Sequence, residues 1–335
     1  MTERASIRDV AEYAAVSPST VSRVLNDRDE NHMRPETKAR VLEAIRILNY
    51  TPVKAAQTLR RQRTKTLGIV IPDITNLYFT MLTRGVESVA FDQGFTTLIC
   101  DSNSSQEREY QYLDILLSEG VEGILYVPVG DSDGAMIERL LNRGIKIVVA
   151  DRRLPNLPSV EVDNQAASRK LTEHILRLGY RRIAYIAGPE EVSTGRDRLR
   201  GFRDALHGWN LEPVSVYRGD FTFESGYELG IRILDSQKVE AIITANDLMA
   251  FGTLRAAEER RFSVPRELGV AGFDHVPHVP YATFMHAELT TVEVPINELG
   301  CAAARLLLDG GRDSVQIETQ LIPGGTCHEL ERRAE

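Results

Sequence analysis

Short apolar runs alternate with helix-like segments from Leu67 onward, and this alternation constrains the fold more than any other feature of the sequence. It predicts βαβ units, parallel sheets and helices on both sheet faces, which is an α/β fold. The stretch is longer than one doubly wound sheet usually needs, so we expect two similar lobes. We predict strands at Leu67–Ile71, Thr96–Cys100, Gly123–Val127, Ile145–Ala150, Arg182–Ala187, Val214–Tyr217, Ala241–Ala245 and Gly269–Phe273.

The first fifty residues lack this alternation and predict three short helices. Ser6 can cap a first helix, whose apolar residues fall on one face: Ile7, Val10, Ala11 and Ala14. Ser17 can cap a second helix, with Pro18 at its first position, where the missing N–H costs nothing. A third helix is predicted from Pro35 to Leu48.

The second helix is the candidate for reading DNA. Its buried stripe turns a polar face outward, made of Pro18, Ser19, Ser22 and Arg23. Two short helices joined by a tight turn form a helix-turn-helix, whose second helix fits a major groove. Arg23 suits the O6 and N7 atoms of guanine, and Ser19 and Ser22 can reach bases or phosphates. On periodicity alone, a small helical bundle without a DNA role is the alternative.

The charge distribution of the chain agrees with a DNA-binding role for the first fifty residues. Residues 1–66 carry a net charge of +5 although the whole chain carries −8, so the head suits a polyanion and the rest does not. No apolar run is long enough to span a membrane, and the first residues do not resemble a secretory signal. Three widely spaced cysteines, without metal-ligand spacing, complete the case for a cytoplasmic protein.

Two stretches of the head resemble the lactose repressor/purine repressor family, namely IRDVAEYAAVSPSTVSRVLN and RPETKARVLEAIRILNYTP. Later segments resemble the two-lobed type I periplasmic-binding-protein fold that this family uses as its sensor: LGIVIPDITNLYF, TGRDRLRGF, TANDLMAFG and GVAGFDH. The resemblance implies a head at 1–50, a hinge and linker at 51–66, and a body at 67–335. Lobe 1 is expected at about 67–162 and 293–319, and lobe 2 at about 163–292 and 320–335.

The resemblance also implies a set of DNA contacts. It places Pro18, Ser19 and Arg23 in the major groove, and it places a short hinge helix in the minor groove, where Leu59 wedges into a base step. Without the resemblance, Leu59 is a plain linker residue. The loop at 27–32 is longer than is usual in the family, which leaves its path near phosphates open. The full set of expected contacts is Ser6, Ser17, Pro18, Ser19, Thr20, Ser22, Arg23, Asn26, Ala55, Ala56, Leu59 and Arg60.

Polar residues at predicted strand and helix ends indicate a ligand site between the lobes. Carboxylates, an amide and a guanidinium suit the hydroxyls of a sugar-like polyol, and by resemblance these contacts are Asp151, Arg198, Asn246 and Asp274. Three aromatic residues are expected to stack on the ligand, with core packing as the alternative: Tyr78, Phe79 and Phe221. Two residues stay open, because Asp247 can be a contact or a helix cap, and Arg152 can meet an acid or solvent.

Other classes of protein fit less well. The sequence lacks the GxGxxG, GxxxxGK[ST] and GxSxG motifs, so we expect neither an enzyme nor a cofactor. His275, His278 and His286 lie close in sequence, but prolines separate them, and loop or pocket lining is favoured over metal. A solute-binding transport protein would lack the head. We therefore expect a homodimeric repressor on a pseudo-palindromic operator, controlled by a small polar effector. The resemblance implies a sugar or sugar derivative, while the aromatic residues leave a purine-like ring open and Arg152 with Arg198 leaves a sugar acid open.

Overall fold

The computed structural model describes residues 5–25, 33–50, 64–130, 134–277 and 287–330. The chain divides into two compact units, Met1–Thr64 and Lys65–Glu335, which are the head and the body. Within the described residues, no helix combines the length and the apolar character that a membrane span needs.

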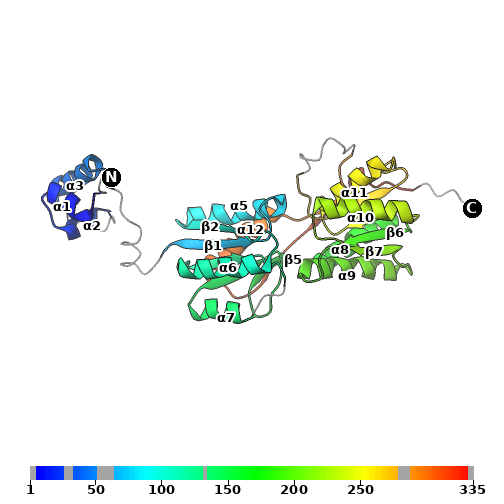
Figure 1. Cartoon of the computed structure of the whole chain (residues 1–335), viewed down its shortest axis with the longest axis horizontal. Coiled ribbons are helices and arrows are strands. Elements are labelled where there is room, and N and C mark those ends of the chain that lie inside the picture. The colour runs from blue at the N-terminus through cyan, green and yellow to red at the C-terminus, as the bar shows by residue number, and fades with distance from the viewer. Residues whose placement is uncertain (1–4, 26–32, 51–63, 131–133, 278–286, 331–335) are drawn as a thin grey trace, which may run out of the picture. The chain divides into compact units, whose positions relative to one another are not determined.

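The head consists of three helices around a small apolar core, as predicted (Figure 1). They are α1 (Ile7–Tyr13), α2 (Pro18–Leu25) and α3 (Pro35–Ile47). Ser6 begins α1 with a reciprocal cap: its Oγ accepts the N–H of Asp9 at 3.4 Å, and its own N–H donates to Asp9 Oδ2 at 2.7 Å. The left-handed backbone of Ala15 turns the chain into α2, whose first turn is capped by Ser17 Oγ accepting the N–H of Thr20.

Lobe 1 of the body is a six-stranded sheet with the order β11-β5-β4-β3-β1-β2, and all its strand pairs are parallel. Ile69 on β1 packs with the α5 and α12 side of the core, whereas its neighbour Val70 packs with α6 and α7. Helices therefore cover both faces, as predicted. The strands are β1 (Thr66–Ile71), β2 (Thr96–Asp101), β3 (Gly123–Tyr126), β4 (Lys146–Ala150), β5 (Ser159–Val162) and β11 (Val315–Ile317), and the helices are α5 (Leu77–Asp92), α6 (Gln106–Ser118), α7 (Gly134–Asn142) and α12 (Ile296–Asp309).

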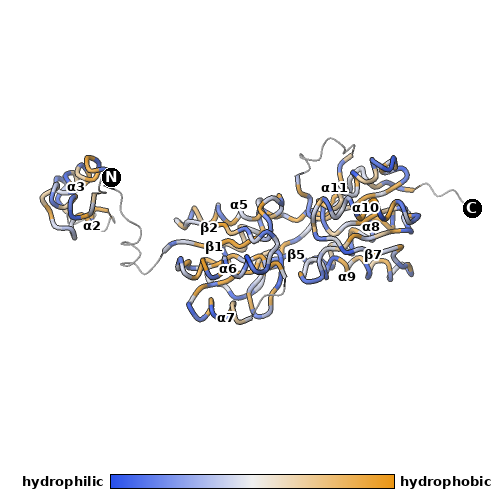
Figure 2. The backbone as a smooth tube through the Cα atoms, in the orientation of Figure 1, coloured by the Kyte–Doolittle hydropathy of each residue, from blue (hydrophilic) through white to orange (hydrophobic). Residues whose placement is uncertain are grey.

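Lobe 2 contains a four-stranded parallel sheet with the order β7-β6-β8-β9 and a separate antiparallel pair, β10 with β12. Figure 2 shows the apolar stretches concentrated along the strands and the inner sides of the helices. The strands are β6 (Ile183–Ala187), β7 (Ser215–Arg218), β8 (Ala241–Thr244), β9 (Gly269–Ala271), β10 (Thr291–Glu293) and β12 (Gln320–Ile322), and the helices are α8 (Asn164–Arg177), α9 (Ser193–Gly208), α10 (Phe223–Ser236) and α11 (Asp247–Glu259).

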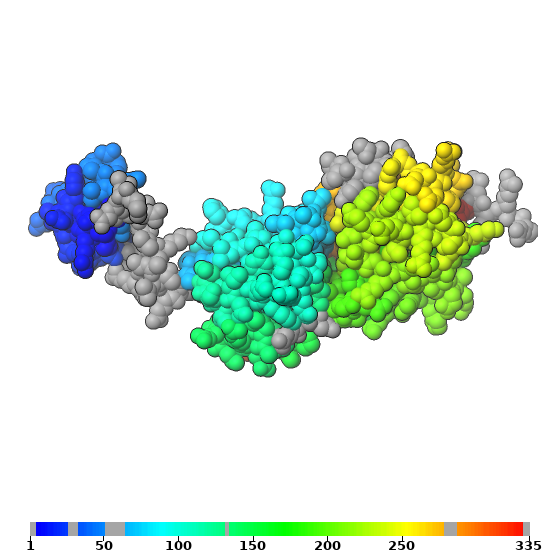
Figure 3. All heavy atoms as spheres, in the orientation of Figure 1, coloured from blue at the N-terminus to red at the C-terminus, as the bar shows by residue number. Residues whose placement is uncertain are grey.

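The chain passes between the lobes after β5, after β10 and after β11. Figure 3 shows the two lobes as distinct masses of atoms that meet along one boundary. All eight predicted strands are present, with ends within two residues of the prediction. Four short strands were not predicted, namely β5, β10, β11 and β12. Each parallel sheet directs the carboxyl ends of its strands toward one edge, which is where the candidate site lies.

Candidate functional site

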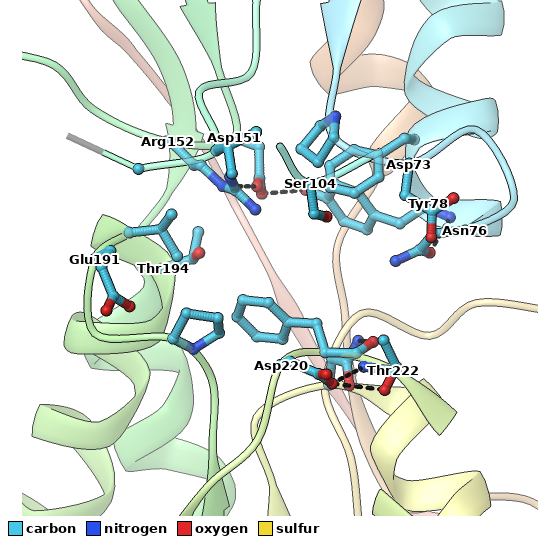
Figure 4. A pocket seen from close by; sticks show the side chains of 18 of the residues that line it. Asp73, Asn76, Tyr78, Ser104, Asp151, Arg152, Glu191, Thr194, Asp220 and Thr222 are labelled. Atoms are coloured by element: carbon cyan, nitrogen blue, oxygen red, sulfur yellow. Dashed lines mark hydrogen bonds and ion pairs between the residues drawn. The ribbon is translucent and has the colours of Figure 1, made fainter. Parts of the chain in front are cut away.

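A cleft of about 540 Å³ lies where strand ends and helix beginnings of both lobes converge. Lobe 1 contributes residues that follow β1, β2, β3 and β4, and lobe 2 contributes residues that follow β6, β7, β8 and β9. Figure 4 shows Asp151 and Arg152 reaching toward the cleft from one side, with Asp220 and Thr222 on the other. Its polar wall consists of Asp73, Asn76, Ser104, Gln106, Asp151, Arg152, Glu191, Thr194, Arg198, Asp220, Thr222, Asn246 and Asp274.

Three wall residues have left-handed backbone conformations that are unusual for residues other than glycine. The φ angles are 67° at Asp151, 68° at Phe221 and 114° at Asp274. Each residue follows a strand, so the chain turns sharply there and presents its side chain to the cleft. Strained backbone of this kind costs on the order of 1–3 kcal/mol and is concentrated at binding sites.

Arg198 of α9 is the centre of the lobe 2 wall. Its Nε donates to Asn164 Oδ1 at 2.8 Å, one terminal nitrogen donates to the carbonyl of Ala245 at 2.7 Å, and the other lies 3.0 Å from Asp274 Oδ1. The guanidinium also stacks on the Phe273 ring at 3.8 Å. These contacts fix Arg198 in one orientation although it is almost completely buried.

On the lobe 1 wall, Asp151 accepts a hydrogen bond of 2.6 Å from the Tyr78 hydroxyl. Its other oxygen lies 3.6 Å from Nε of Arg152, whose guanidinium also donates to the carbonyl of Pro128. Arg152 is buried, so the prediction that it faces solvent is wrong, and the acidic group beside it is Asp151. The Nε of Arg152 has no hydrogen-bond acceptor within the described residues.

Burial and neighbouring charges shift several pKa values in this wall. Burial raises the pKa of Asp274 to about 7, although Arg198 acts in the opposite direction. Burial and the charge of Asp151 raise the pKa of Tyr78, so it remains a hydroxyl donor. Burial by itself lowers the pKa of Arg198, but Asp274 and Asp151 more than offset this effect. The two arginines of the wall each lie beside a carboxylate, Arg152 beside Asp151 and Arg198 beside Asp274.

Phe221 is held at the rim of lobe 2 by its backbone. Its carbonyl accepts a hydrogen bond of 3.0 Å from Asn246 Nδ2, while Asn246 Oδ1 caps α11 by accepting the N–H of Met249. The Phe221 ring lies directly against Gly188, where a Cβ atom would come within 2.2 Å of the ring. Asn246 therefore supports an aromatic wall residue as well as lining the cleft.

All seven predicted effector contacts line this cleft, including the three aromatic residues. The structure thereby places them together around one cleft. Sequence reasoning missed several polar wall residues. Asn76 and Thr222 are helix N-caps, and Asp220 follows a strand. Capping and strand-end position were therefore the signals that could have identified these three residues.

Asp247 does neither of the two things considered for it. It is not among the residues that line the cleft, and Asn246 is the residue that caps α11. Asp247 is buried, where its oxygens accept the N–H of Val276 at 2.9 Å and the hydroxyl of Thr291 at 2.6 Å. Both readings of Asp247 were therefore wrong, because its carboxylate instead connects the segment at Val276 to the first residue of β10.

In the head, the second helix has the exposed face that was predicted. Pro18, Ser19 and Arg23 are exposed, and Ser22 is half-buried. The hydroxyl of Ser17 lies 2.7 Å from that of Ser19 and 2.9 Å from that of Thr20, so these three groups form a small network at the start of α2. Asn26, the loop at 27–32 and four hinge positions lie outside the described residues: Ala55, Ala56, Leu59 and Arg60.

The described residues contain no cluster of three or more side chains suited to holding a metal ion. His275 is exposed, while His278 and His286 lie outside the described part of the chain.

A helix-turn-helix head on a two-lobed body with a polar interlobe cleft defines a ligand-binding regulator of transcription. A family model for "Bacterial regulatory proteins, lacI family" matches residues 6–53. A second model, for "Periplasmic binding proteins and sugar binding domain of LacI family", matches residues 64–327. The chain belongs to the LacI family and is a DNA-binding transcriptional regulator with a sugar-binding type of body.

Individual relatives agree with this assignment. The ribose operon repressor of Halalkalibacterium halodurans is 34% identical over 309 residues, which cover 90% of this chain and 89% of the relative. The HTH-type transcriptional repressor CytR of Escherichia coli is 33% identical, covering 97% of each chain. A crystal structure of the lac repressor dimer bound to operator and the anti-inducer ONPF has the same fold, with a TM-score of 0.86 at 24% identity, covering 97% of this chain and 100% of that one.

Proposed function

We propose that this chain is a repressor that binds a pseudo-palindromic operator as a homodimer. A sugar-like effector lowers or raises its affinity for the operator. The observation that carries this proposal is the composition of the cleft wall, to which both lobes contribute polar groups. A ligand that touches both lobes has different affinities for different lobe orientations, and this difference is what lets it shift the equilibrium between them. Coupling of this kind is typically about 1–3 kcal/mol.

The effector contacts we propose are the two ends of this wall. Asp151 and Asp274 accept hydrogen bonds from ligand hydroxyls, and Arg198 and Asn246 contact the ligand from lobe 2. The rings of Tyr78, Phe79 and Phe221 cover the apolar face of a sugar ring. Four of these seven side chains are charged or amide groups that hold internal partners already, so they are oriented before the ligand arrives.

We propose an uncharged effector rather than a sugar acid. Five carboxylates line the cleft, against two guanidinium groups: Asp73, Asp151, Glu191, Asp220 and Asp274 against Arg152 and Arg198. Arg198 faces Asp274, and Arg152 lies beside Asp151, so neither cation is free of a neighbouring carboxylate. An anionic ligand would meet an excess of like charge, which disfavours it.

We propose that α2 enters the major groove, with Arg23 reading a guanine and Ser17, Ser19, Thr20 and Ser22 contacting bases or phosphates. The resemblance of the hinge to its family supports minor-groove contacts from Ala55, Ala56, Leu59 and Arg60, and further contacts from Ser6 and Asn26. Because its target is the bacterial operator, we propose that the protein works in the cytoplasm.

We also propose that the body binds its ligand without transforming it. The relatives named above are regulators, and no histidine, cysteine or lysine side chain lines the cleft in the described part of the chain. Histidine is the residue most often used as a general base, and cysteine and lysine are common nucleophiles.

The test is operator binding by the purified full chain, measured by fluorescence anisotropy at one salt concentration. A pseudo-palindrome from the region upstream of its own gene is titrated with and without a panel of neutral sugars, sugar acids and purines. A shift of tenfold or more with one neutral sugar is the expected result. A shift with a sugar acid or a purine would overturn the proposed ligand class, and no specific DNA binding would overturn the repressor itself.

A further inference from the structure

Arg153 follows the cleft residues Asp151 and Arg152 but lies outside the cleft lining. Its guanidinium is about half exposed and joins two carboxylates. One terminal nitrogen lies 2.9 Å from Glu161 Oε2, and the other forms an ion pair with Asp197. Its backbone N–H also donates to Ser193 Oγ at 3.0 Å. Arg153 therefore has three polar contacts just behind the cleft.

These partners belong to different lobes. Glu161 is on β5, next to the point where the chain leaves lobe 1, whereas Ser193 and Asp197 are in the first turns of α9 in lobe 2. Arg153 itself follows β4 of lobe 1. Two of its three contacts thus cross the lobe boundary, and the third ties the same guanidinium back to its own lobe.

The segments joined in this way are those that carry the cleft wall. Asp151 and Arg152 directly precede Arg153, Thr194 follows Ser193, and Arg198 follows Asp197. A displacement of β4 relative to α9 must therefore change the separation between the Asp151 and Arg198 sides of the wall. The partners are also well buried, with side-chain exposures of 10% for Glu161 and 14% for Asp197.

Burial raises the pKa of Glu161 to about 7, although Arg153 opposes this effect, so Glu161 is only partly ionised near neutral pH. The contact across the lobe boundary is reinforced by the hydrogen bond from the Arg153 backbone N–H to Ser193 Oγ.

We propose that Arg153 is a positioning residue that links the end of β4 to the start of α9 and thereby sets the separation of the two cleft walls. It acts through Asp151, Arg152 and Arg198, and it does not touch the ligand. The lobe-to-lobe link exists whatever the ligand is; its importance for regulation rests on the proposed function.

The experiment measures the distance between lobes directly. Spin labels are placed on exposed cysteines introduced at Arg143 of lobe 1 and Arg203 of lobe 2, in a full chain carrying Cys301→Ser, and the distance distribution is measured by electron–electron double resonance. The labelled protein is mixed with excess unlabelled protein, so that almost every labelled copy pairs with an unlabelled one. Asp197→Asn is compared with Glu161→Gln, which leaves the interlobe contact in place.

We expect Asp197→Asn to broaden the distribution and shift it to longer distances, Arg153→Ala to do the same, and Arg153→Lys to restore part of the original distribution. Glu161→Gln should stay close to the parent. Asp235→Asn is a further control, because it removes an Arg–Asp pair of 2.7 and 2.9 Å that lies within lobe 2, with Arg260.

An Asp197→Asn distribution that coincides with the parent distribution would overturn the proposal, and so would an equal effect of Glu161→Gln. The measurement needs neither ligand nor DNA. A protein that responds to no compound in the operator assay would therefore contradict the proposed function without changing this result.

Discussion

The hydroxyl of Tyr78 donates a hydrogen bond of 2.6 Å to Oδ1 of Asp151 and so ties the first turn of α5 to the end of β4 inside the cleft. Because Asp151 has a left-handed backbone and two oxygens to satisfy, this bond restricts where its second oxygen can point. The contact connects two residues that are far apart in the sequence, and it positions a carboxylate for a ligand hydroxyl before binding takes place.

We therefore expect Tyr78→Phe to weaken effector binding by about three- to tenfold, because Asp151 would then be ordered only on binding, and ordering one side chain costs about 0.5–1.5 kcal/mol. Isothermal titration of the full chain with the effector found in the operator assay measures this change. Tyr180→Phe is the matched control, since the Tyr180 hydroxyl is also bonded, to the N–H of His328, but lies outside the cleft lining. Equal losses in both variants would mean that the effect is general destabilisation.

Replacing Arg23 with alanine should weaken operator binding by about 1–3 kcal/mol and relax the preference at one base pair, if Arg23 reads a guanine. Anisotropy titrations with single-base operator variants, at one salt concentration, measure both effects. Arg46→Ala is the control, because this α3 residue pairs with Glu43 at 2.6 Å on the surface. A uniform loss across all operator variants for Arg23→Ala would show a phosphate contact rather than a base contact.

The alternation of apolar runs predicted eight strands of the body because each lies in a short apolar or β-rich run, and six of them are followed directly by a helix. It could not predict β5, whose sequence SVEV alternates polar and apolar residues and so indicates a half-exposed strand. All four residues are buried, since β5 lies between β4 and β11. Ser159 and Glu161 are tolerated there because Ser314 and Arg153 supply hydrogen-bond partners from segments that the local sequence does not contain.

The candidate site was predictable where position along a strand decides it, and less so where distant partners decide it. Asp151 and Asp274 follow predicted strands, so the parallel-sheet rule places each at the carboxyl-end edge of its own sheet. Asp247 also follows a strand, but its buried carboxylate accepts hydrogen bonds from Thr291 of β10 and from the N–H of Val276. Nothing in the local sequence distinguishes these two outcomes, because the partners of Asp247 arrive from residues that are distant along the chain.

Gly188→Ala should weaken effector binding by displacing the Phe221 ring, because the added Cβ would lie 2.2 Å from that ring. The obstructed atoms belong to a side chain, so we expect the ring to move and the loss of stability to stay near 1 kcal/mol. Titration calorimetry and chemical denaturation measure the two effects. Gly208→Ala is the matched control, since a Cβ there meets nothing within 4 Å. Unchanged effector affinity in Gly188→Ala would show that the ring does not contact the ligand.

The stability of the protein should fall as the pH rises from about 5 to 8. Burial raises the pKa of Asp274 and Glu161 to about 7 each, and it also raises the pKa of Glu109 and Asp247. Between their unfolded values and these raised values, the folded protein binds more protons than the unfolded chain, so stability is lost as these groups ionise. Half-buried His174 has a lowered pKa and opposes this trend, but it is one group against four.

We expect the unfolding free energy to drop by roughly 2 kcal/mol or more across this range, measured by urea denaturation of the full chain. Glu161→Gln removes one of the four carboxyls without touching the cleft lining, so its pH dependence should be shallower than that of the parent. A parent stability that stays constant or rises between pH 5 and 8 would contradict the assignment, because it would mean that the buried carboxylates are ionised at no cost. If Glu161→Gln leaves the slope of stability against pH unchanged, the pH dependence comes from the other three carboxyl groups.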